Sequence, residues 1–240
     1  MEAKSKEIKP TDNLVLASLP EKELKRLMDR LKLTELSDEE ILWESEENGE
    51  YLYFPVSALI SLTYESDNGN SVSIATIGRH GVVGAGIVMS SIRSPDKATV
   101  IRGGEVFRLK ASSVKKELAE CGDLHALLSA FTQSLMVKIS QNAICNRLHR
   151  IEQQLCRWLL EWRDELKTCD VEMTHEQIAQ ILGVRRESIS LAASELQKQK
   201  FISAGRRKIR LNDLDGLERS ACECYSVIKE QISSLKSFRP

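Results

Sequence analysis

Two adjacent charged residues, Arg186 and Glu187, have side chains that suit hydrogen bonds to base edges in the major groove of DNA. An arginine can donate two hydrogen bonds to guanine O6 and N7, and a glutamate can accept one from cytosine N4. Ser190 follows one helical turn later and would lie on the same helix face, within reach of a base or a phosphate. Residues that suit phosphate contacts flank this group: Thr174, His175, Arg185 and Ser188.

The segment around these residues is strongly basic within a chain of net charge −1. Between Gly183 and Leu211 there are eight basic residues and two acidic ones, Glu187 and Glu195, which gives 8 − 2 = +6. The basic residues are Arg185, Arg186, Lys198, Lys200, Arg206, Arg207, Lys208 and Arg210. We expect a hairpin from Phe201 to Leu211, in which Arg206, Arg207 and Lys208 form a basic wing that neutralises phosphates. The alternative is a solvated charged face with no nucleic-acid partner.

A helix-turn-helix is the element that would position these side chains. Thr174 is a suitable N-cap for a helix with apolar residues at Ile178, Ile181 and Leu182. Ala179 is small at the expected helix crossing, and Gly183 follows four residues later, where a sharp turn favours positive φ. Val184 and Ile189 would seat the second helix. We predict the motif at about 174–200, its recognition helix at about 185–199 and the wing at 205–210, although two-helix hairpins without DNA binding share this pattern.

Two amphipathic helices are predicted before the motif. The first has an apolar stripe of Leu124, Leu128, Phe131, Leu135 and Ile139, and we expect it to end near Leu148. A long helix at a domain junction is typical of a seam with a second copy of the chain. The alternative is that it packs only on its own β domain, and Asn142 and Asn146 would cost stability at a seam. The second helix spans Ile151 to Leu166, in the core of the C-terminal domain.

The N-terminal half is predicted to be rich in strands after short helices between Asn13 and Leu33. Strand-like runs are separated by three turn signals, Asn48-Gly49, Asn68-Gly69 and Gly103-Gly104. The runs are Glu40 to Trp43, Tyr51 to Tyr64, Val72 to Ile77 and Thr99 to Leu109. Such turns are typical of two-residue hairpins, and repeated hairpins predict an antiparallel roll, barrel or sandwich.

Composition and motifs exclude several classes of protein. The first 13 residues lack the apolar region of a secretory signal, and the apolar stretch from Gly81 to Met89 is too short to span a bilayer, so we expect a cytoplasmic protein without a membrane partner. His175-Glu176 is followed by Ala179 where a zinc protease needs a second histidine, and phosphate-binding and nucleophile-elbow motifs are absent from the sequence. We therefore predict that the protein is not an enzyme.

The chain resembles the Crp/Fnr superfamily of bacterial regulators over nearly its whole length. The resemblance is carried by THEQIAQILGVRRESIS from Thr174 to Ser190, by Leu196 and Phe201-Ile-Ser, and by two upstream runs, YLYFPVSALISL from Tyr51 and IGRHGVVG from Ile77. It implies an α+β chain: an N-terminal antiparallel β-roll of the cyclic-nucleotide-binding type (double-stranded β-helix or cupin-like), a long dimerisation helix and a C-terminal winged helix-turn-helix. It also implies a homodimer on a pseudo-palindromic DNA operator, with RNA polymerase and a small-molecule effector as further partners.

Two departures from the family pattern affect the DNA sequence that we expect the protein to bind and the effector that we expect it to sense. Leu191 stands where members commonly carry a second arginine, so we expect a different operator. Gly84-Ala85-Gly86 lacks the glutamate that holds the ribose of a cyclic nucleotide. Candidate effector contacts in the roll are Gly84, Ala85, Arg93 and Lys97. Arg93-Ser94 lies near the position where the family's Arg-Ser pair binds the phosphate, but Lys97 is closer to the expected spacing. The missing carboxylate argues against a cyclic nucleotide, and haem or another small effector stays open; no cofactor is predicted.

The six cysteines indicate reduced thiols. The first is Cys121, so the chain lacks the N-terminal cysteine group of members with an iron–sulfur cluster. Cys222 and Cys224 form the one close pair, without clustered Cys or His partners in the sequence, and we expect a structural or accidental pair rather than a redox or metal sensor. No metal site is predicted. The other cysteines are Cys145, Cys156 and Cys169.

The length of 240 residues suits two domains. We expect the roll with its N-terminal helices at 1–120, the long helix at 121–150, the winged helix-turn-helix at 151–215 and a helical extension at 216–240. The predicted function is sequence-specific DNA binding that is regulated by a signal in the roll. The alternative is a ligand-binding regulatory subunit that acts on a protein partner, which would leave the basic wing unexplained.

Overall fold

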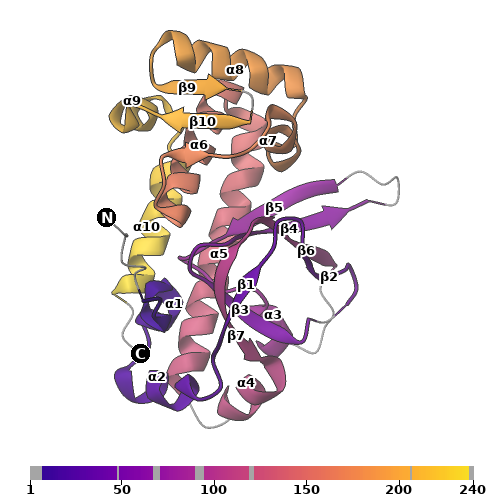
Figure 1. Cartoon of the computed structure of the whole chain (residues 1–240), viewed down its shortest axis with the longest axis vertical. Helices are drawn as coiled ribbons and strands as arrows, with labels where there is room; N and C mark the ends of the chain where they lie inside the picture. Colours follow the sequence, from indigo (N-terminus) through magenta and orange to yellow (C-terminus); the bar gives the residue numbers. More distant parts are fainter. Residues whose placement is uncertain are drawn as a thin grey trace.

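The computed structural model describes residues 7–47, 49–66, 71–89, 95–118, 122–205 and 207–237. Several residues that the sequence analysis singled out lie outside these ranges: Asn48, Asn68-Gly69, Arg93-Ser94, Cys121 and Arg206. Figure 1 shows the chain as a β-rich lower body, one long helix and a smaller body at the upper end of that helix.

Two antiparallel sheets form the lower body. One has the order β1-β7-β3, with β1 at Lys32–Leu36, β7 at Gly104–Lys110 and β3 at Tyr51–Pro55. The other has the order β2-β6-β4-β5, with β2 at Ile41–Trp43, β6 at Asp96–Arg102, β4 at Leu59–Glu65 and β5 at Ser71–Ile77. Side chains from both sheets, such as Phe54, Ile60 and Val100, are fully buried in one core. The fold class expected from the sequence is confirmed.

The predicted hairpins are wrong at two of the three turn signals. β4 and β5 pair with each other in antiparallel register as far as Glu65 and Ser71, and the Asn68-Gly69 signal between them lies outside the described residues. However, Gly103-Gly104 takes the chain from β6 in one sheet to β7 in the other, and β2 and β3 on either side of Asn48-Gly49 also belong to different sheets. The glycines at Gly103-Gly104 allow the backbone to pass close to the end of β1. A Cβ on Gly103 would lie 2.7 Å from the carbonyl oxygen of Leu36, and Gly104 has φ 155°. A roll uses such turns to change sheets.

Short helices cover the ends of the roll. They are the 3-10 turn η1 at Pro10–Asp12, α1 at Leu14–Ala17, α2 at Glu21–Met28, α3 at Ala85–Met89 and α4 at Ala111–Leu118. The predicted helices near the N-terminus are thus present, although β1 already begins at Lys32. Asn13 caps α1 by accepting from the backbone of Val15 and Leu16, and its amide donates to the carbonyl oxygens of Pro55 and Gly81. This buried amide fixes the N-terminal helices on the roll.

The long helix α5 runs from Gly122 to Leu148, and it ends where the sequence predicted. Its buried residues Leu124, Leu128 and Phe131 belong to the core of the roll, and Leu135 packs against that core. Four of the five stripe positions thus face the protein's own roll, as in the alternative interpretation, while Ile139 is half-buried and is not part of that core. A seam of α5 with a second copy stays a prediction. A different set of α5 side chains is exposed: Met136, Ile144 and Leu148.

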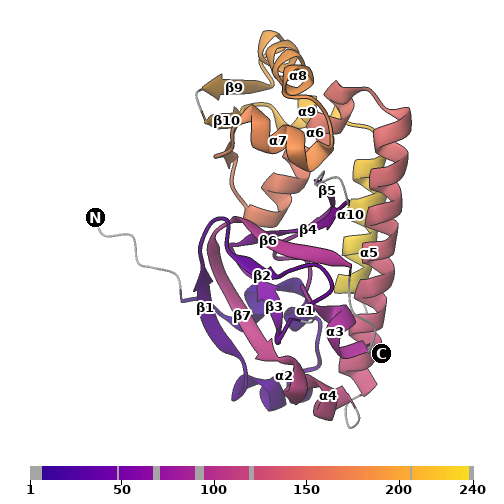
Figure 2. The same ribbon diagram turned by 90° about the vertical axis from the view of Figure 1, so that its right-hand side faces the viewer.

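The C-terminal helix α10, Cys224–Lys236, lies alongside α5 and returns the chain to the roll (Figures 1 and 2). Leu235 near its end joins the roll core, and its carbonyl oxygen accepts a hydrogen bond from Ser18. Asn142 of α5 donates to the carbonyl oxygen of Ile74 on β5, so this asparagine faces the roll instead of a seam. Over the described ranges, no helix is both long and apolar enough to cross a membrane.

The upper body is a small α/β unit around α6, Ile151–Leu166. Its helices α7 (His175–Leu182), α8 (Arg186–Lys198) and α9 (Leu214–Ser220) pack with a sheet of order β8-β10-β9. The strands are β8 at Asp170–Val171, β9 at Ile202–Gly205 and β10 at Lys208–Leu211. Apolar side chains of α6, α7 and α8, including Leu159, Ile178 and Ile189, form its core.

Candidate nucleic-acid interface and ligand cavity

The first helix of the predicted motif begins with a complete capping box. The Thr174 hydroxyl accepts from the Gln177 backbone N–H at 3.2 Å, and the Gln177 side chain accepts from the Thr174 N–H at 2.9 Å. Gly183 ends the helix in the left-handed region, with φ 66°. Ala179 is buried at the crossing with α8 and accepts the backbone hydrogen bond of Val184 at 3.0 Å. The predicted helix-turn-helix is confirmed in each of these details.

The second helix, α8, is buried on one face and open on the other. Ile189, Ala192, Ala193 and Leu196 are buried in the domain core. Arg186 and Glu187 are exposed on the opposite face, and Leu191 is 72% exposed. Leu191 therefore presents a large aliphatic side chain to the surroundings on the same helix as Arg186 and Glu187. In Figure 1, α8 lies at the end of the molecule away from the roll.

His175 and Ser190 join the starts of the two helices. His175 Nδ1 lies 3.0 Å from the Ser190 hydroxyl, which also donates to the carbonyl oxygen of Arg186 at 3.2 Å. Burial lowers the pKa of His175, and the positive charge of Arg186 lowers it further. A neutral imidazole can therefore hold the serine at neutral pH. Both side chains are half-buried and keep an exposed edge beside Arg186.

The predicted wing is the β9–β10 hairpin, in which Lys208 pairs with Gly205 in register. Arg207 stands at its tip with φ 138°. Asp170 on β8, which the charge count omitted, lies 3.1 Å from Lys208 and 3.4 Å from Arg210. The strand pairing of Arg210 with Asp170 brings this carboxylate to the wing, and nothing in local sequence spacing reveals that pairing. The wing is therefore less positive than its sequence suggests.

Four cations around the motif have no ion pair in the part of the chain that the structure describes: Arg185, Arg186, Lys200 and Arg207. Arg185 precedes α8, and Ser188 in its first turn is half-buried, with its N–H bonded to the Arg185 carbonyl oxygen. Thr174 is half-buried at the start of α7. Every described candidate for DNA contact is thus at least partly exposed, near the start of α7, on α8 or on the wing.

Residues 153–220 match the family of Crp-like helix-turn-helix domains. The chain has the fold of the Crp/Fnr regulators. Three solved structures show the likeness over most of the chain. FixK2 from Bradyrhizobium japonicum aligns with a TM-score of 0.69 at 20% identity, covering 80% of this chain and 98% of that one. A transcriptional regulator of the CRP family from Thermus thermophilus aligns with a TM-score of 0.65 at 18% identity, covering 78% and 96%.

The third is the c-di-GMP responsive global regulator Clp from Xanthomonas campestris, with a TM-score of 0.64 at 13% identity and coverage of 80% and 99%. At these identities the likeness shows the fold alone. A comparison with curated protein sequences finds no match. The resemblance inferred from the sequence is confirmed for the Crp-like domain and for the fold of the whole chain.

The roll candidates for effector binding have structural partners of their own. Gly84 has φ 93°, and a Cβ there would lie 2.9 Å from the carbonyl oxygen of Tyr51, so tight packing requires this glycine. Ala85 is buried at the start of α3. Lys97 forms an ion pair with Glu44 at 3.0 Å. Arg93 lies outside the described residues. None of the described candidates, Gly84, Ala85 and Lys97, carries a carboxylate that could hold a ribose.

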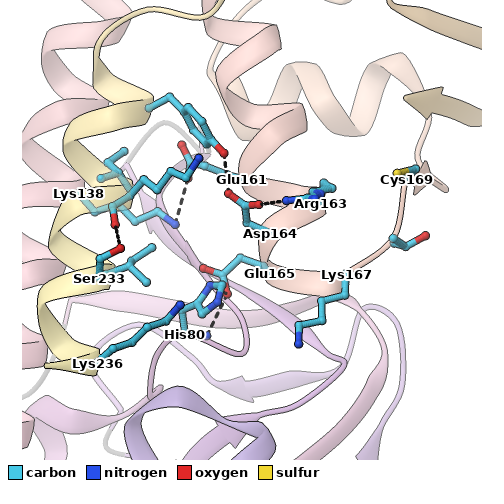
Figure 3. Close-up of a pocket in the computed structure, with 15 residues that line it drawn as sticks. His80, Lys138, Glu161, Arg163, Asp164, Glu165, Lys167, Cys169, Ser233 and Lys236 are labelled. Atoms are coloured by element: carbon cyan, nitrogen blue, oxygen red, sulfur yellow. Dashed lines mark hydrogen bonds and ion pairs between the residues drawn. The ribbon is translucent and has the colours of Figure 1, made fainter. Parts of the chain in front are cut away.

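A cavity of about 520 Å³ lies instead where the roll, α5, α6 and α10 meet (Figure 3). Lys138 of α5, Glu161, Asp164 and Glu165 of α6 and Lys236 of α10 are among its lining residues. Arg163 forms an ion pair with Asp164 at 2.8 Å. The cavity is in the range of volumes that hold small molecules, and its wall carries charges of both signs. Spacing in the sequence does not reveal this cavity, because its lining residues range from His80 to Lys236.

A buried ionic network beside this cavity connects the Crp-like domain to the roll. Glu161 of α6 lies 3.1 Å from Lys138 and also pairs with Arg157. Lys138 donates to the carbonyl oxygen of Thr76 on β5, and Arg157 donates to Asn142. Burial alone would raise the pKa of Glu161, but the charges of Lys138 and Arg157 outweigh it and hold the pKa below its usual value. A buried carboxylate of α6 is thus connected to α5 and, through Lys138, to β5.

Proposed function

We propose that the protein is a sequence-specific DNA-binding transcription regulator. The observation that carries this proposal is the exposed face of α8 in a Crp-like domain, where Arg186 and Glu187 stand beside a basic hairpin. Arg186 reads guanine, Glu187 reads cytosine, and Leu191 contacts a thymine methyl group. Phosphate contacts come from the start of α7, from the start of α8 and from the wing: Thr174, His175, Arg185, Ser188, Arg206, Arg207 and Lys208. Ser190 contacts a base or a phosphate beside Arg186.

The active form in this proposal is a homodimer on a pseudo-palindromic operator. This dimer is supported by three apolar side chains of α5 that no other described part of the chain buries. Met136 is 58% exposed, Ile144 is 41% exposed and Leu148 is 71% exposed. A second copy of α5 would cover them and place two recognition helices in successive major grooves, about one helical turn apart. The exposed apolar set differs from the stripe expected from sequence, which is buried in the roll.

Signal input is proposed at the junction cavity rather than at the roll positions Gly84, Ala85 and Lys97. A small molecule there would contact α6 and α10 together, next to the network that joins Glu161 to Lys138. Occupancy would change the free-energy difference between two placements of the Crp-like domain on the roll. RNA polymerase contact would follow DNA binding, as expected from the family resemblance.

Fluorescence anisotropy with random-sequence duplex DNA at two salt concentrations tests the DNA partner. We expect measurable binding at low salt and a steep linear fall of log affinity with log salt, because several cations displace counterions from phosphates. Absence of binding to any duplex at low salt would overturn the proposal. That outcome would favour a regulatory subunit that acts on a protein partner.

A further inference from the structure

Four metal-ligating side chains from two distant segments meet where α5 ends and α10 begins. They are Cys145, His149, Cys222 and Cys224, and their donor atoms all lie within 4.8 Å of one another. Cys145 Sγ is 3.4 Å from Cys222 Sγ, and Cys224 Sγ is 3.6 Å from His149 Nδ1. The sequence-based premise that Cys222 and Cys224 lack Cys or His partners is therefore wrong, since the fold supplies partners 77 and 75 residues away.

We propose that Cys145, His149, Cys222 and Cys224 bind one Zn²⁺ ion as a structural Cys₃His site. Zinc–sulfur bonds of about 2.3 Å and zinc–nitrogen bonds of about 2.0 Å require tetrahedral edges of roughly 3.8 Å between sulfurs and 3.5 Å between sulfur and nitrogen. The separations of 3.4 Å between Cys145 and Cys222 and 3.6 Å between Cys224 and His149 lie near those values. The four donor atoms lie within 4.8 Å of one another, a spacing that suits a single four-coordinate ion.

Local structure aims the four donors at this point. Cys145 and His149 are four residues apart, and the His149 N–H donates to the Cys145 carbonyl oxygen at 3.1 Å, so the last turn of α5 places both on one face. Cys222 and Cys224 flank a tight turn that is closed by the Tyr225 N–H and the Cys222 carbonyl oxygen. Gln154 of α6 donates to the carbonyl oxygens of both Cys145 and His149, which holds the α5 turn in place.

The surroundings match those of a bound zinc ion. His149 Nε2 lies 3.1 Å from a carboxylate oxygen of Glu223, so an Nε2–H bond to this carboxylate leaves the Nδ1 lone pair facing Cys224. A carboxylate on the far nitrogen of a zinc-binding histidine is a common arrangement. The three cysteines are buried and the His149 side chain is only 12% exposed, so four protein ligands close the site, as in structural zinc sites.

The charge of a loaded site would suit one of its neighbours. Arg157 is buried and close enough to Cys145 and Cys222 for their charges to interact. Zn²⁺ with three thiolates and a neutral imidazole carries 2 − 3 = −1, so the guanidinium would stabilise the loaded site. The ion would fasten α10 to the end of α5 and to α6.

The zinc content of the full-length protein, purified without a metal-affinity step and measured by inductively coupled plasma mass spectrometry, tests this site. We expect about one zinc per chain, and a loss of at least ninefold in the variant Cys222→Ser/Cys224→Ser. Cys169→Ser changes a cysteine outside the cluster and should keep the metal. His149→Cys preserves a ligand and should also keep it, whereas His149→Ala should release it, which separates ligation from general damage to the fold.

Co²⁺ added to reduced, chelator-treated protein gives a second readout, the absorption of tetrahedral cobalt thiolate. We expect this spectrum in wild type and in Cys169→Ser, and its absence in the double variant. The proposal would be overturned if the purified protein contained no zinc and the reduced protein took up neither Zn²⁺ nor Co²⁺. A disulfide between Cys145 and Cys222 in protein that takes up no metal after reduction would overturn it too. Both results leave DNA binding to be judged by its own assay.

Discussion

At the scale of single residues, specificity depends on very few side chains. Arg186 and Glu187 are exposed on α8, while Lys208 and Arg210 on the wing share the carboxylate of Asp170. A cation that is already paired gives up that partner when it contacts a phosphate, so its net contribution to binding is smaller than that of an unpaired cation. We therefore expect Arg186 to determine base choice and Arg207 to contribute mainly sequence-independent affinity.

Arg186→Ala tests base readout. We expect the variant to lose about 1–3 kcal/mol of binding free energy for a selected operator, because a bidentate contact with guanine is removed, and much less for random duplex. Competition anisotropy with both DNAs measures the difference. Arg207→Ala is the matched control, which should weaken binding to both DNAs alike and reduce the salt slope by about 1. Equal losses on both DNAs for Arg186→Ala would exclude base readout by this residue.

Sequence reasoning succeeded for these residues because a helix-turn-helix is a local pattern. The cap at Thr174, the turn at Gly183 and the apolar spacing of α8 are all encoded within 25 residues. Asp170, by contrast, reaches the wing only through strand pairing, and Cys145 reaches Cys222 only through the packing of α10 on α5. Chemistry that depends on contacts between distant segments cannot be deduced from spacing in one sequence.

At the scale of elements, the structure differs most from expectation in how strands and helices pair. The glycines at Gly103-Gly104 predicted a hairpin, but the chain passes there from β6 in one sheet to β7 in the other. In a roll, neighbouring strands of a sheet come from distant parts of the chain, so consecutive strands need not pair. The stripe of α5 was correctly identified as apolar, yet periodicity does not say whether the partner is the same chain or a second copy. The roll and α10 cover that stripe here.

Gly183→Ala tests the turn between α7 and α8. Gly183 has φ 66°, so an alanine there would adopt a left-handed backbone conformation that raises the free energy of the folded state. Its Cβ would meet open space, so no steric clash adds to this effect. We expect a loss of about 1–2 kcal/mol in the free energy of unfolding, measured with urea. Gly86→Ala is the control, since this helical glycine also has open space around its Cβ but no positive φ. An equal effect of both substitutions would contradict the assigned role of the turn.

Glu161→Gln tests the buried network between α6, α5 and β5. The substitution leaves Lys138 and Arg157 without their counter-charge, so we expect a loss of about 3–5 kcal/mol in the free energy of unfolding near neutral pH. The pKa of Glu161 is lower in the folded state than its ordinary value of 4.5. Its stabilisation is therefore present above pH 4.5 and is lost as the pH falls through the folded-state pKa.

Urea unfolding between pH 3 and pH 7 checks this dependence. Wild type should lose stability below about pH 4.5 more steeply than Glu161→Gln, because the variant has no carboxyl group to protonate there. Glu230→Gln, at an exposed position of α10, should follow the wild-type profile. Parallel profiles for wild type and Glu161→Gln would show that Glu161 is not linked to folding as described.

At the scale of the whole molecule, α5 and α10 connect the two bodies, and the remaining apolar surface of α5 is available for a second copy. The Crp-like domain contacts the roll through α7 and β5 and through an ion pair between Glu172 and Arg102 at 2.6 Å. These contacts, together with the Glu161 network, hold one relative placement of the two bodies. A ligand in the junction cavity would act by favouring or disfavouring that placement.

Met136→Glu tests the proposed dimer face. A charge within a covered apolar face would raise the dimer dissociation constant by more than about tenfold, and it would lower operator affinity because the two half-sites would be bound separately. Analytical ultracentrifugation measures the first effect. Leu33→Glu places the same charge at an exposed leucine on β1 and should leave the dimer intact. A dimer that survives Met136→Glu unchanged would place the interface elsewhere.

The central claim is sequence-specific DNA binding through the exposed face of α8, and selection of binding sites from a randomised duplex library by the full-length protein tests it most directly. We expect enrichment of an inverted repeat whose half-sites lie about one helical turn apart. Repeating the selection with Arg186→Ala should relax one G·C position in each half-site. Recovery of no enriched sequence by wild type, or of the same sequence by both proteins, would contradict the assignment of α8 as the reading element.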